Sequence, residues 1–438
     1  MSVTFESKSA PPSRRKPLRK AGVLGIALVL LVTGCGGSGT DDGKVSLRVL
    51  WWGSDTRHRM TEEIIAEFEK THPNIDIQPE FTGWNDYWDR LATNTAAGDM
   101  PDIVQHDADY LREYAERGAL LELDEYMPNV IDPAKLDESV LGTGEVEGKT
   151  YAIPTGINAY SVVADPAIFE QAGVAMPDDE TWTWQQFIDT AAQISRNTPD
   201  GVYGLQDIGF VDAGIQVFAR QRGETLYGGE GELGVSDETL RDWFQMIVDA
   251  RDSGAEPPPS RSIEVQAGNV DQSLAATRSG GMGLWWTNQL PTVSELAGRE
   301  LKLLRFPGES ERPGMYLKPG MFWTASSKTE HPEEAAEFID WMVNNPRPAE
   351  IQLSDRGLPI NTEVRDHIVP QLSPADQQAR TFLEEITPQL ASPPKLPPPG
   401  SPEVQDILIQ INEAVLFDRL SPEQAAEQFR TKAENAIA

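Results

Sequence analysis

An alternation of strand-like and helix-like segments begins near residue 44, and no other feature of the sequence constrains the fold more strongly. Residues 44–52, KVSLRVLWW, form a nearly continuous apolar run that is typical of a buried strand. Apolar residues then recur at helical spacing until Pro73 ends the helix. Residues 75–81 and 101–107 are predicted strands, and each is followed by a predicted helix. This rhythm predicts a parallel, doubly wound α/β sheet.

A second series of strands and helices begins near residue 160. Residues 159–173, AYSVVADPAIFEQAG, predict a strand followed by a helix, with Asp165 as N-cap and Gly173 just past the last turn. Thr183 and Gln186 fit a capping box at the start of the next helix. The other predicted elements are helices at 236–252 and 263–279, strands at 281–286 and 301–307, and several helices in the last hundred residues.

The N-terminal residues resemble a bacterial export signal. Basic residues over 14–20 precede an apolar segment, 21–32, that is too short to span a bilayer. The segment ends in LVTGC, which resembles a lipobox, so we expect a lipoprotein signal peptide over 1–34 and a lipid on Cys35. Residues 35–43 form a polar, glycine-rich tether. An uncleaved signal anchor with a chance cysteine is the alternative, and the choice between Sec and twin-arginine export stays open.

Composition excludes several classes of protein. The net charge of −32 argues against a nucleic acid partner. Cys35 is the sole cysteine of the 438 residues, which excludes a disulfide within the chain. The five histidines are scattered without metal-ligand spacing, and the sequence has no nucleophile elbow, P-loop or dinucleotide fingerprint. We therefore expect no enzyme activity, no cofactor and no metal.

Two tryptophan pairs end predicted strands. Trp51 and Trp52 close the first strand, and Trp285 and Trp286 close the strand at 281–286. Successive side chains of a strand point to opposite faces of the sheet, so one ring of each pair is expected to pack inward. Ligands of open α/β sheets bind beyond the carboxyl ends of the strands, so the other ring is expected to face a cleft.

The chain resembles the family 1 extracellular solute-binding proteins of ABC importers, the maltose-binding-like group. The resemblance runs from about residue 44 to the end, in the family's order, and its more specific parts are AAGDMPDIV (96–104) and the block 153–173. It implies a two-lobed, type II periplasmic-binding-protein-like α/β fold, with several hinge crossings and a doubly wound sheet flanked by helices in each lobe. The implied lobes are 44–158 plus 323–362, and 159–322 plus 363–438.

The resemblance also implies a ligand site between the lobes. Carried onto this sequence by position, the expected ligand-binding residues are Trp52, Ser54, Trp84, Asp107, Asn158, Trp285, Trp286, Met321, Phe322 and Arg356. Structural roles stay open for them. Asp107 could simply cap a helix, Asn158 could serve a hinge turn, and Arg356 could make a structural ion pair.

Tryptophan enrichment near the expected cleft favours a carbohydrate ligand, because indole faces stack on the C–H face of a sugar ring. The implied function is capture of a carbohydrate, expected to be an oligosaccharide, and its delivery to the permease subunits of an ABC importer. The protein is expected to be a monomer outside the cytoplasm, held to the cell membrane by its lipid. The alternatives are the same fold with a peptide, polyamine or glycerol phosphodiester ligand, a surface glycoside hydrolase, and an adhesin for polymeric glycan.

Overall fold

The computed structural model describes residues 43–228, 231–268 and 270–438. The predicted signal peptide, Cys35 and all but the last residue of the predicted tether lie outside the described residues. Over the described ranges, no helix is long and apolar enough to cross a membrane.

A five-stranded sheet combines four strands from the first part of the described chain with one from much later. Its central strand β1 (Val45–Trp52) pairs in parallel with β2 (Ile75–Thr82) and β3 (Ile103–His106). The sheet continues through β13 (Phe322–Ala325), which is antiparallel to β3, and ends at β6 (Ala152–Pro154). The sheet is therefore mixed and not all parallel, because β13 runs antiparallel to both β3 and β6.

A four-stranded sheet has the order β11-β8-β10-β9. Strand β8 (Tyr160–Ala164) is antiparallel to both β10 (Gly280–Trp286) and β11 (Lys302–Leu304). Only β9 (Tyr203–Leu205) is parallel to β10. This sheet is therefore mixed as well.

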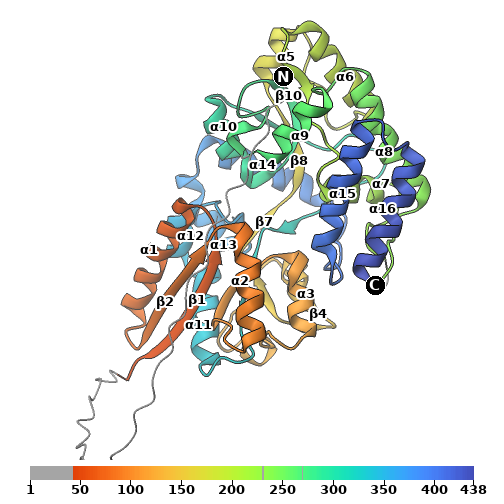
Figure 1. Ribbon diagram of the computed structural model, residues 1–438. Coiled ribbons are helices and arrows are strands. Elements are labelled where there is room, and N and C mark those ends of the chain that lie inside the picture. Colours follow the sequence, from red (N-terminus) through yellow and green to blue (C-terminus); the bar gives the residue numbers. More distant parts are fainter. Residues whose placement is uncertain (1–42, 229–230, 269) are drawn as a thin grey trace, which may run out of the picture. The chain divides into compact units, whose positions relative to one another are not determined.

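A small sheet of three short strands lies where the chain was predicted to cross between lobes. Strand β7 (Gly156–Asn158) pairs antiparallel with β12 (Lys318–Pro319) on one side and β14 (Leu358–Pro359) on the other. In Figure 1, β7 lies between the elements around β1 and β2 and those around β8. The outermost two-stranded sheet is β4 (Glu145–Val146) with β5 (Lys149–Thr150).

Helices flank these sheets. They are α1 (Asp55–Thr71), α2 (Trp84–Ala97), α3 (Ala108–Glu116), α4 (Glu138–Leu141), α5 (Pro166–Ala172), α6 (Trp184–Asn197), α7 (Asp212–Gln221), α8 (Asp237–Asp252), α9 (Pro259–Ala267), α10 (Leu290–Ala297), α11 (Pro332–Asn344), α12 (Pro346–Gln352), α13 (Thr362–Ile368), α14 (Pro374–Ile386), α15 (Ser401–Leu416) and α16 (Pro422–Ile437). The helix predicted over 263–279 is wrong in extent, because α9 ends at Ala267 and Gly268 follows in an extended conformation.

Local sequence signals account for several helix ends. The predicted capping box at Thr183 and Gln186 is present at the start of α6. The Asp165 side chain accepts a hydrogen bond from the Ala167 N–H at the start of α5, and Gly173 ends that helix with φ of 64°. A left-handed φ is inexpensive only for glycine, so these expectations from sequence are confirmed at the residue level.

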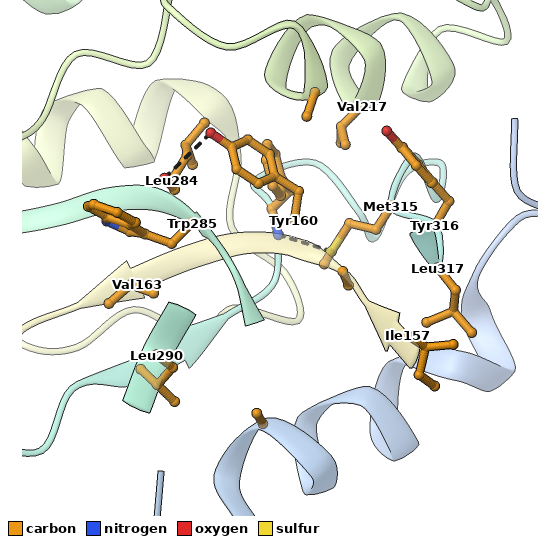
Figure 2. Close-up of a cluster of buried hydrophobic side chains, with 14 of the residues drawn as sticks. Ile157, Tyr160, Val163, Val217, Leu284, Trp285, Leu290, Met315, Tyr316 and Leu317 are labelled. Carbon is orange, nitrogen blue, oxygen red and sulfur yellow. Dashed lines mark hydrogen bonds between the residues drawn. The ribbon is translucent and has the colours of Figure 1, made fainter. Parts of the chain in front are cut away.

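Both faces of the first sheet are buried, in two different clusters. Along β1, Trp51 belongs to the larger hydrophobic core, whereas Trp52 packs in a second cluster with Tyr87 and Trp88. Around the β8 strand, the core holds Tyr160 and Trp285, and Figure 2 shows the Tyr160 ring directed toward Leu284. The Tyr160 hydroxyl donates to the Leu284 carbonyl at 3.4 Å. Strand alternation thus places Trp51 and Trp52 in different clusters, but both rings are buried, so neither has the exposure expected of a ring that faces a cleft.

Candidate functional site

A cavity of about 700 Å³ lies between elements that pack around the two larger sheets. One wall comes from residues along α3, and another comes from α7 and the loop that follows it. Strand β12 and the residues before it form the third wall, and the proline-rich segment 393–399 forms the fourth. Its principal polar and aromatic lining residues are Asp109, Arg112, Glu116, Glu147, Asp212, Arg220, Tyr227, Tyr316, Lys318 and Lys395. A volume of this size suits a small organic ligand.

Lys318 is one of the cationic residues that line the cavity. Within the described residues its side chain forms neither an ion pair nor a hydrogen bond. Burial alone would lower the pKa of Lys318, but the carboxylates of Asp109, Asp107 and Asp212 together raise it above its usual range. The ammonium group is therefore charged and has its hydrogen-bonding capacity free for a ligand.

Two of the surrounding carboxyls titrate near neutral pH. Burial raises the pKa of Asp107 to about 6, although Lys318 opposes the shift. Burial, followed by the charge of Asp109, raises the pKa of Asp212 to about 6. Asp107 and Asp109 come from the start of α3, and Asp212 comes from the start of α7, so elements far apart in the sequence supply charges to one site.

Trp286 is the predicted site residue that lies beside this charge. The Lys318 ammonium lies 5.4 Å from the Trp286 ring centroid, in a cation–π arrangement. The Trp286 ring also contacts the Tyr160 ring, at a centroid distance of 4.9 Å. Trp285, its neighbour, is buried with 8% exposure. Of this pair, Trp286 is therefore the member that contacts Lys318, a residue of the cavity lining.

The proline-rich segment connects the opposite walls. The Arg220 side chain of α7 donates to the Ser392 carbonyl at 2.6 Å, which fixes the start of the segment. Leu396 packs against the aromatic cluster that contains Trp52 and Trp88. At the end of the segment, the Ser401 hydroxyl donates to the Asp109 carbonyl of α3 at 3.1 Å. The segment thus lies across one side of the cavity.

The aromatic cluster that includes Trp88 contains three of the predicted site residues, Trp52, Met321 and Phe322. Trp52 is 6% exposed and meets the Trp84 ring edge-on at 5.1 Å. Trp84 itself is 44% exposed, and Met321 is buried in the same cluster. Phe322, also buried there, is the one predicted residue that lines the cavity. Ligand contact by Trp52, Trp84 and Met321 stays a prediction.

Ser54 and Asp107 act as helix caps in the structure. The exposed Ser54 side chain accepts from the Arg57 N–H at the start of α1. The Asp107 carboxylate accepts from the Asp109 N–H at the start of α3, at 3.0 Å. The capping alternative is therefore realised for Asp107, alongside its electrostatic contact with Lys318.

Asn158 and Arg356 lie near the small sheet. Asn158 is the register partner of Lys318, and its buried side-chain oxygen has no partner within the described residues. Arg356 is 1% exposed and donates to Gln105, Gln352 and Thr61, at 3.0, 3.0 and 2.8 Å. Desolvation lowers the pKa of Arg356 to about 9. These neutral partners give Arg356 structural hydrogen bonds, and no ion pair of Arg356 is present among the described residues. Ligand contact by Arg356 stays a prediction.

Sequence reasoning missed the polar residues of the cavity. Asp109, Asp212 and Lys318 carry no local motif, and they meet only because α3, α7 and β12 do. The one available signal was position, since Lys318 lies just before the predicted crossing that contains Phe322. In the described part of the chain, no group of three or more His, Cys, Asp or Glu side chains is arranged to hold a metal.

Two sheets joined by three crossings, with a cavity lined from both sides, define a two-lobed binding protein of the type II periplasmic class. The sequence matches the bacterial extracellular solute-binding protein family over residues 55–346, and the chain belongs to that family. It is therefore an extracytoplasmic solute-binding protein of ABC transporters, from a family of binding proteins and not of enzymes.

Several known proteins are similar to this chain. An uncharacterized lipoprotein of Streptomyces antibioticus is 28% identical over 41% of this chain, and that alignment covers 39% of its own length. A binding protein of Brucella abortus is 23% identical over 95% of this chain and 97% of its own.

Solved structures agree with the fold. A family 1 extracellular solute-binding protein from Alicyclobacillus acidocaldarius has a TM-score of 0.71 and 29% identity, over 90% of this chain and 98% of that one. A Yersinia enterocolitica oligogalacturonide binding protein, in complex with saturated digalacturonic acid, has a TM-score of 0.75 and 21% identity, over 90% and 99%. The second likeness supports the two-lobed fold alone.

Proposed function

We propose that this chain is a lipid-anchored protein that captures a carbohydrate between its two lobes and delivers it to the permease of an ABC importer. The observation that carries the proposal is the cavity of about 700 Å³, which is lined by charged groups and by the rings of Tyr227, Tyr316 and Phe322. Carboxylates accept hydrogen bonds from sugar hydroxyls, an ammonium donates to them, and aromatic faces contact the apolar face of the sugar.

The charge balance of the lining favours a neutral saccharide. Four carboxylates and four cationic side chains line the described part of the cavity. A polyamine would be favoured by an excess of carboxylates, and a glycerol phosphodiester by an excess of cations. The similar proteins include an arabinooligosaccharide-binding protein and a protein solved with mannotriose, which makes an oligosaccharide the first ligand class to test.

The lobes of this proposal are those implied by the sequence. Residues 44–158 plus 323–362 form one, and residues 159–322 plus 363–438 form the other. The small sheet of β7, β12 and β14 ties the three crossings together. Ligand binding is proposed to close the lobes about these crossings, a motion established for this class of protein.

A thermal-shift screen tests the ligand class. A ligand that binds only the native state stabilises it by mass action, so a neutral oligosaccharide is expected to raise the melting temperature. The panel includes galacturonides, peptides, polyamines and glycerol phosphodiesters, with calorimetry to establish one bound ligand per monomer. A response confined to a peptide, a polyamine or a phosphodiester would remove the carbohydrate assignment. Turnover of a chromogenic glycoside by the pure protein would favour the hydrolase alternative.

The anchor has a separate test. In a bacterial host, the wild-type chain is expected to partition into the detergent phase, because the lipid on Cys35 adds buried hydrocarbon. Cys35→Ser should move the protein to the aqueous phase without changing its ligand affinity. Detergent partitioning by the Cys35→Ser chain would instead support an uncleaved signal anchor.

A further inference from the structure

Two buried carboxyls outside the lining of the ligand cavity are in contact with each other. Asp207 follows β9 and Glu256 follows α8, and their side chains are hydrogen-bonded to one another. Glu256 is 5% exposed, and apart from this contact its two carboxyl oxygens lack hydrogen-bond partners within the described residues. Two ionised carboxylates cannot form a hydrogen bond, because each only accepts, so one member of the pair holds a proton.

The surrounding donors identify Glu256 as the residue that holds this proton. Oδ1 of Asp207 accepts from the Gly209 N–H and from the Asn412 side-chain amide, each at 2.9 Å. Burial raises the pKa of Asp207 to about 6, and the bonds from Gly209, Asn412 and Glu256 oppose this rise. Burial, and then the charge of Asp207, raises the pKa of Glu256 well above its usual range. The Glu256 carboxyl is therefore the donor, and the Asp207 carboxylate is the acceptor.

The nearby basic residue is already paired elsewhere. Besides Asp207, Arg251 of α8 is the charged residue that acts on Glu256. Its guanidinium donates to two main-chain carbonyls of α15 and forms ion pairs with Asp252 and Asp418. The proton therefore has no cation as a substitute once it leaves.

The other elements packed around the pair bring neutral contacts. Ser195 of α6 donates to the Ala255 carbonyl, next to Glu256, at 3.1 Å. The charged residues of α9, Arg261 and Glu264, pair with each other at 2.8 Å. A change in the charge of Glu256 is therefore felt mainly by Asp207.

The carboxyl pair lies at the base of a loop that reaches the ligand cavity. A Cβ on Gly209 would lie 2.2 Å from Oδ1 of Asn412, so this loop packs closely against α15. Farther along the loop, the Asp212 N–H donates to the Gln405 side chain of α15 at 2.9 Å. Asp212 lines the cavity. The pair thus holds the start of a segment whose end positions a cavity residue.

We propose that the proton on Glu256 locks residues 207–212 onto α8 and α15, and that its release at alkaline pH loosens this loop. When the proton passes to solvent, the hydrogen bond to Asp207 is replaced by repulsion between two buried carboxylates. Buried charges without a partner are costly, so the loop has to move and admit water. Asp212 is then no longer held at the cavity, a consequence that rests on the proposed ligand site.

Infrared spectroscopy of the ligand-free protein tests for the proton. Asp107 and Asp212, with pKa values of about 6, are ionised at pH 8, where Glu256 should still give the carbonyl band of a protonated carboxylic acid. Glu256→Gln should remove this band, because its amide donates to Asp207 without a titrating proton.

Glu309→Gln is the matched control for the infrared band. The Glu309 carboxylate already accepts from the Gly314 and Met315 N–H groups, so it has donors that Glu256 lacks. The control should keep the band at pH 8.

Thermal melting measures the proton by linkage. An unfolded glutamate releases its proton near about pH 4.3, whereas folded Glu256 keeps it, so the stability that this residue contributes falls as the pH rises toward its folded pKa. Between pH 6 and 8, the melting temperature of the wild type should fall about 3 °C further than that of Glu256→Gln. Equal slopes in the two proteins would overturn the proposal.

Hydrogen–deuterium exchange locates the loosening. Peptides that cover residues 206–212 should exchange faster in the wild type than in Glu256→Gln once the pH exceeds the value at which the infrared band disappears. Equal exchange in both proteins above that pH would overturn the lock. So would a band that survives in Glu256→Gln. Absence of any protonated carboxylic acid from the wild type at pH 8 overturns the proposal even if the variant fails to fold.

Discussion

Lys318 is the residue on which the chemistry of the cavity centres. Its ammonium group lies over Trp286 and is surrounded by carboxyls of α3 and α7, yet no described carboxylate pairs with it directly. A partly buried cation with free donors is costly unless something binds it, and a ligand hydroxyl or carbonyl is the natural partner. The same charge partly opposes the rise that burial causes in the pKa values of Asp107 and Asp212.

Lys318→Met should therefore weaken saccharide binding and change its pH dependence. Ionised carboxylates accept hydrogen bonds from sugar hydroxyls, so wild-type affinity is expected to rise as the pH increases through about 6, where Asp107 and Asp212 ionise. Lys318 lowers both pKa values, so its removal should move this midpoint to higher pH. Calorimetry from pH 5 to 8 measures both effects. An unchanged midpoint would show that these carboxyls do not contact the ligand.

Arg356→Met should destabilise the fold and leave ligand affinity nearly unchanged. The substitution leaves the side-chain oxygens of Gln105 and Gln352 buried without a donor, at a cost of about 3 kcal/mol in the free energy of unfolding. Arg347→Met is the control, because Arg347 is exposed and its ion pairs are worth about 1 kcal/mol or less. Urea denaturation gives the stabilities. A large loss of affinity in the folded Arg356→Met protein would restore the ligand-binding role that the family position implies.

At the scale of elements, the small three-stranded sheet shows how closely the crossings pack. A Cβ on Gly156 of β7 would lie 2.6 Å from the Arg356 carbonyl oxygen and 2.7 Å from the Gly357 carbonyl carbon. Both contacts are with backbone, which has little freedom to move away. Gly156 is therefore required by the close approach of β14, and the crossings form one tightly packed unit.

Gly156→Ala should destabilise the protein by about 1–3 kcal/mol, because overpacking forces the neighbouring backbone to shift. Gly142→Ala is the matched control, since the nearest atom to its added Cβ is a glutamate side-chain oxygen at 4.0 Å. Thermal and urea denaturation compare the two variants. Equal stabilities would mean that β7 and β14 separate easily, and that the crossings are looser than the structure indicates.

The sequence predicted elements better than it predicted the site. Helix starts such as Thr183 with Gln186, and ends such as Gly173, depend on residues a few positions apart, so local patterns reveal them. Strand direction was not predictable in the same way, because the antiparallel entry of β13 depends on a long-range pairing with β3. The electrostatic interaction of Asp212 with Lys318 likewise exists only in the folded chain. Trp52 was predicted to bind ligand because it is an aromatic residue at the end of a strand, although both faces of its sheet are buried.

At the scale of the whole molecule, the proline-rich segment links walls that belong to different proposed lobes. Leu396 lies against the aromatic cluster of the first sheet, and Ser401 donates to the Asp109 carbonyl. Both contacts require the lobes to be close together, so they favour the closed arrangement. Proline limits the conformations of the segment, and this lowers the entropic cost of holding it there.

Leu396→Ser should shift the equilibrium toward the open arrangement and weaken saccharide binding. Burial of a leucine side chain is worth about 1.5–3 kcal/mol, and the partly buried Leu396 contributes less than this, so the expected loss of affinity is about tenfold. Leu296→Ser is the control, because Leu296 is 44% exposed on α10. Small-angle scattering should show a larger radius of gyration for Leu396→Ser without ligand, and closure at saturating saccharide. A variant that matches the wild type in both affinity and radius of gyration would show that the segment only covers the cavity and does not influence closure.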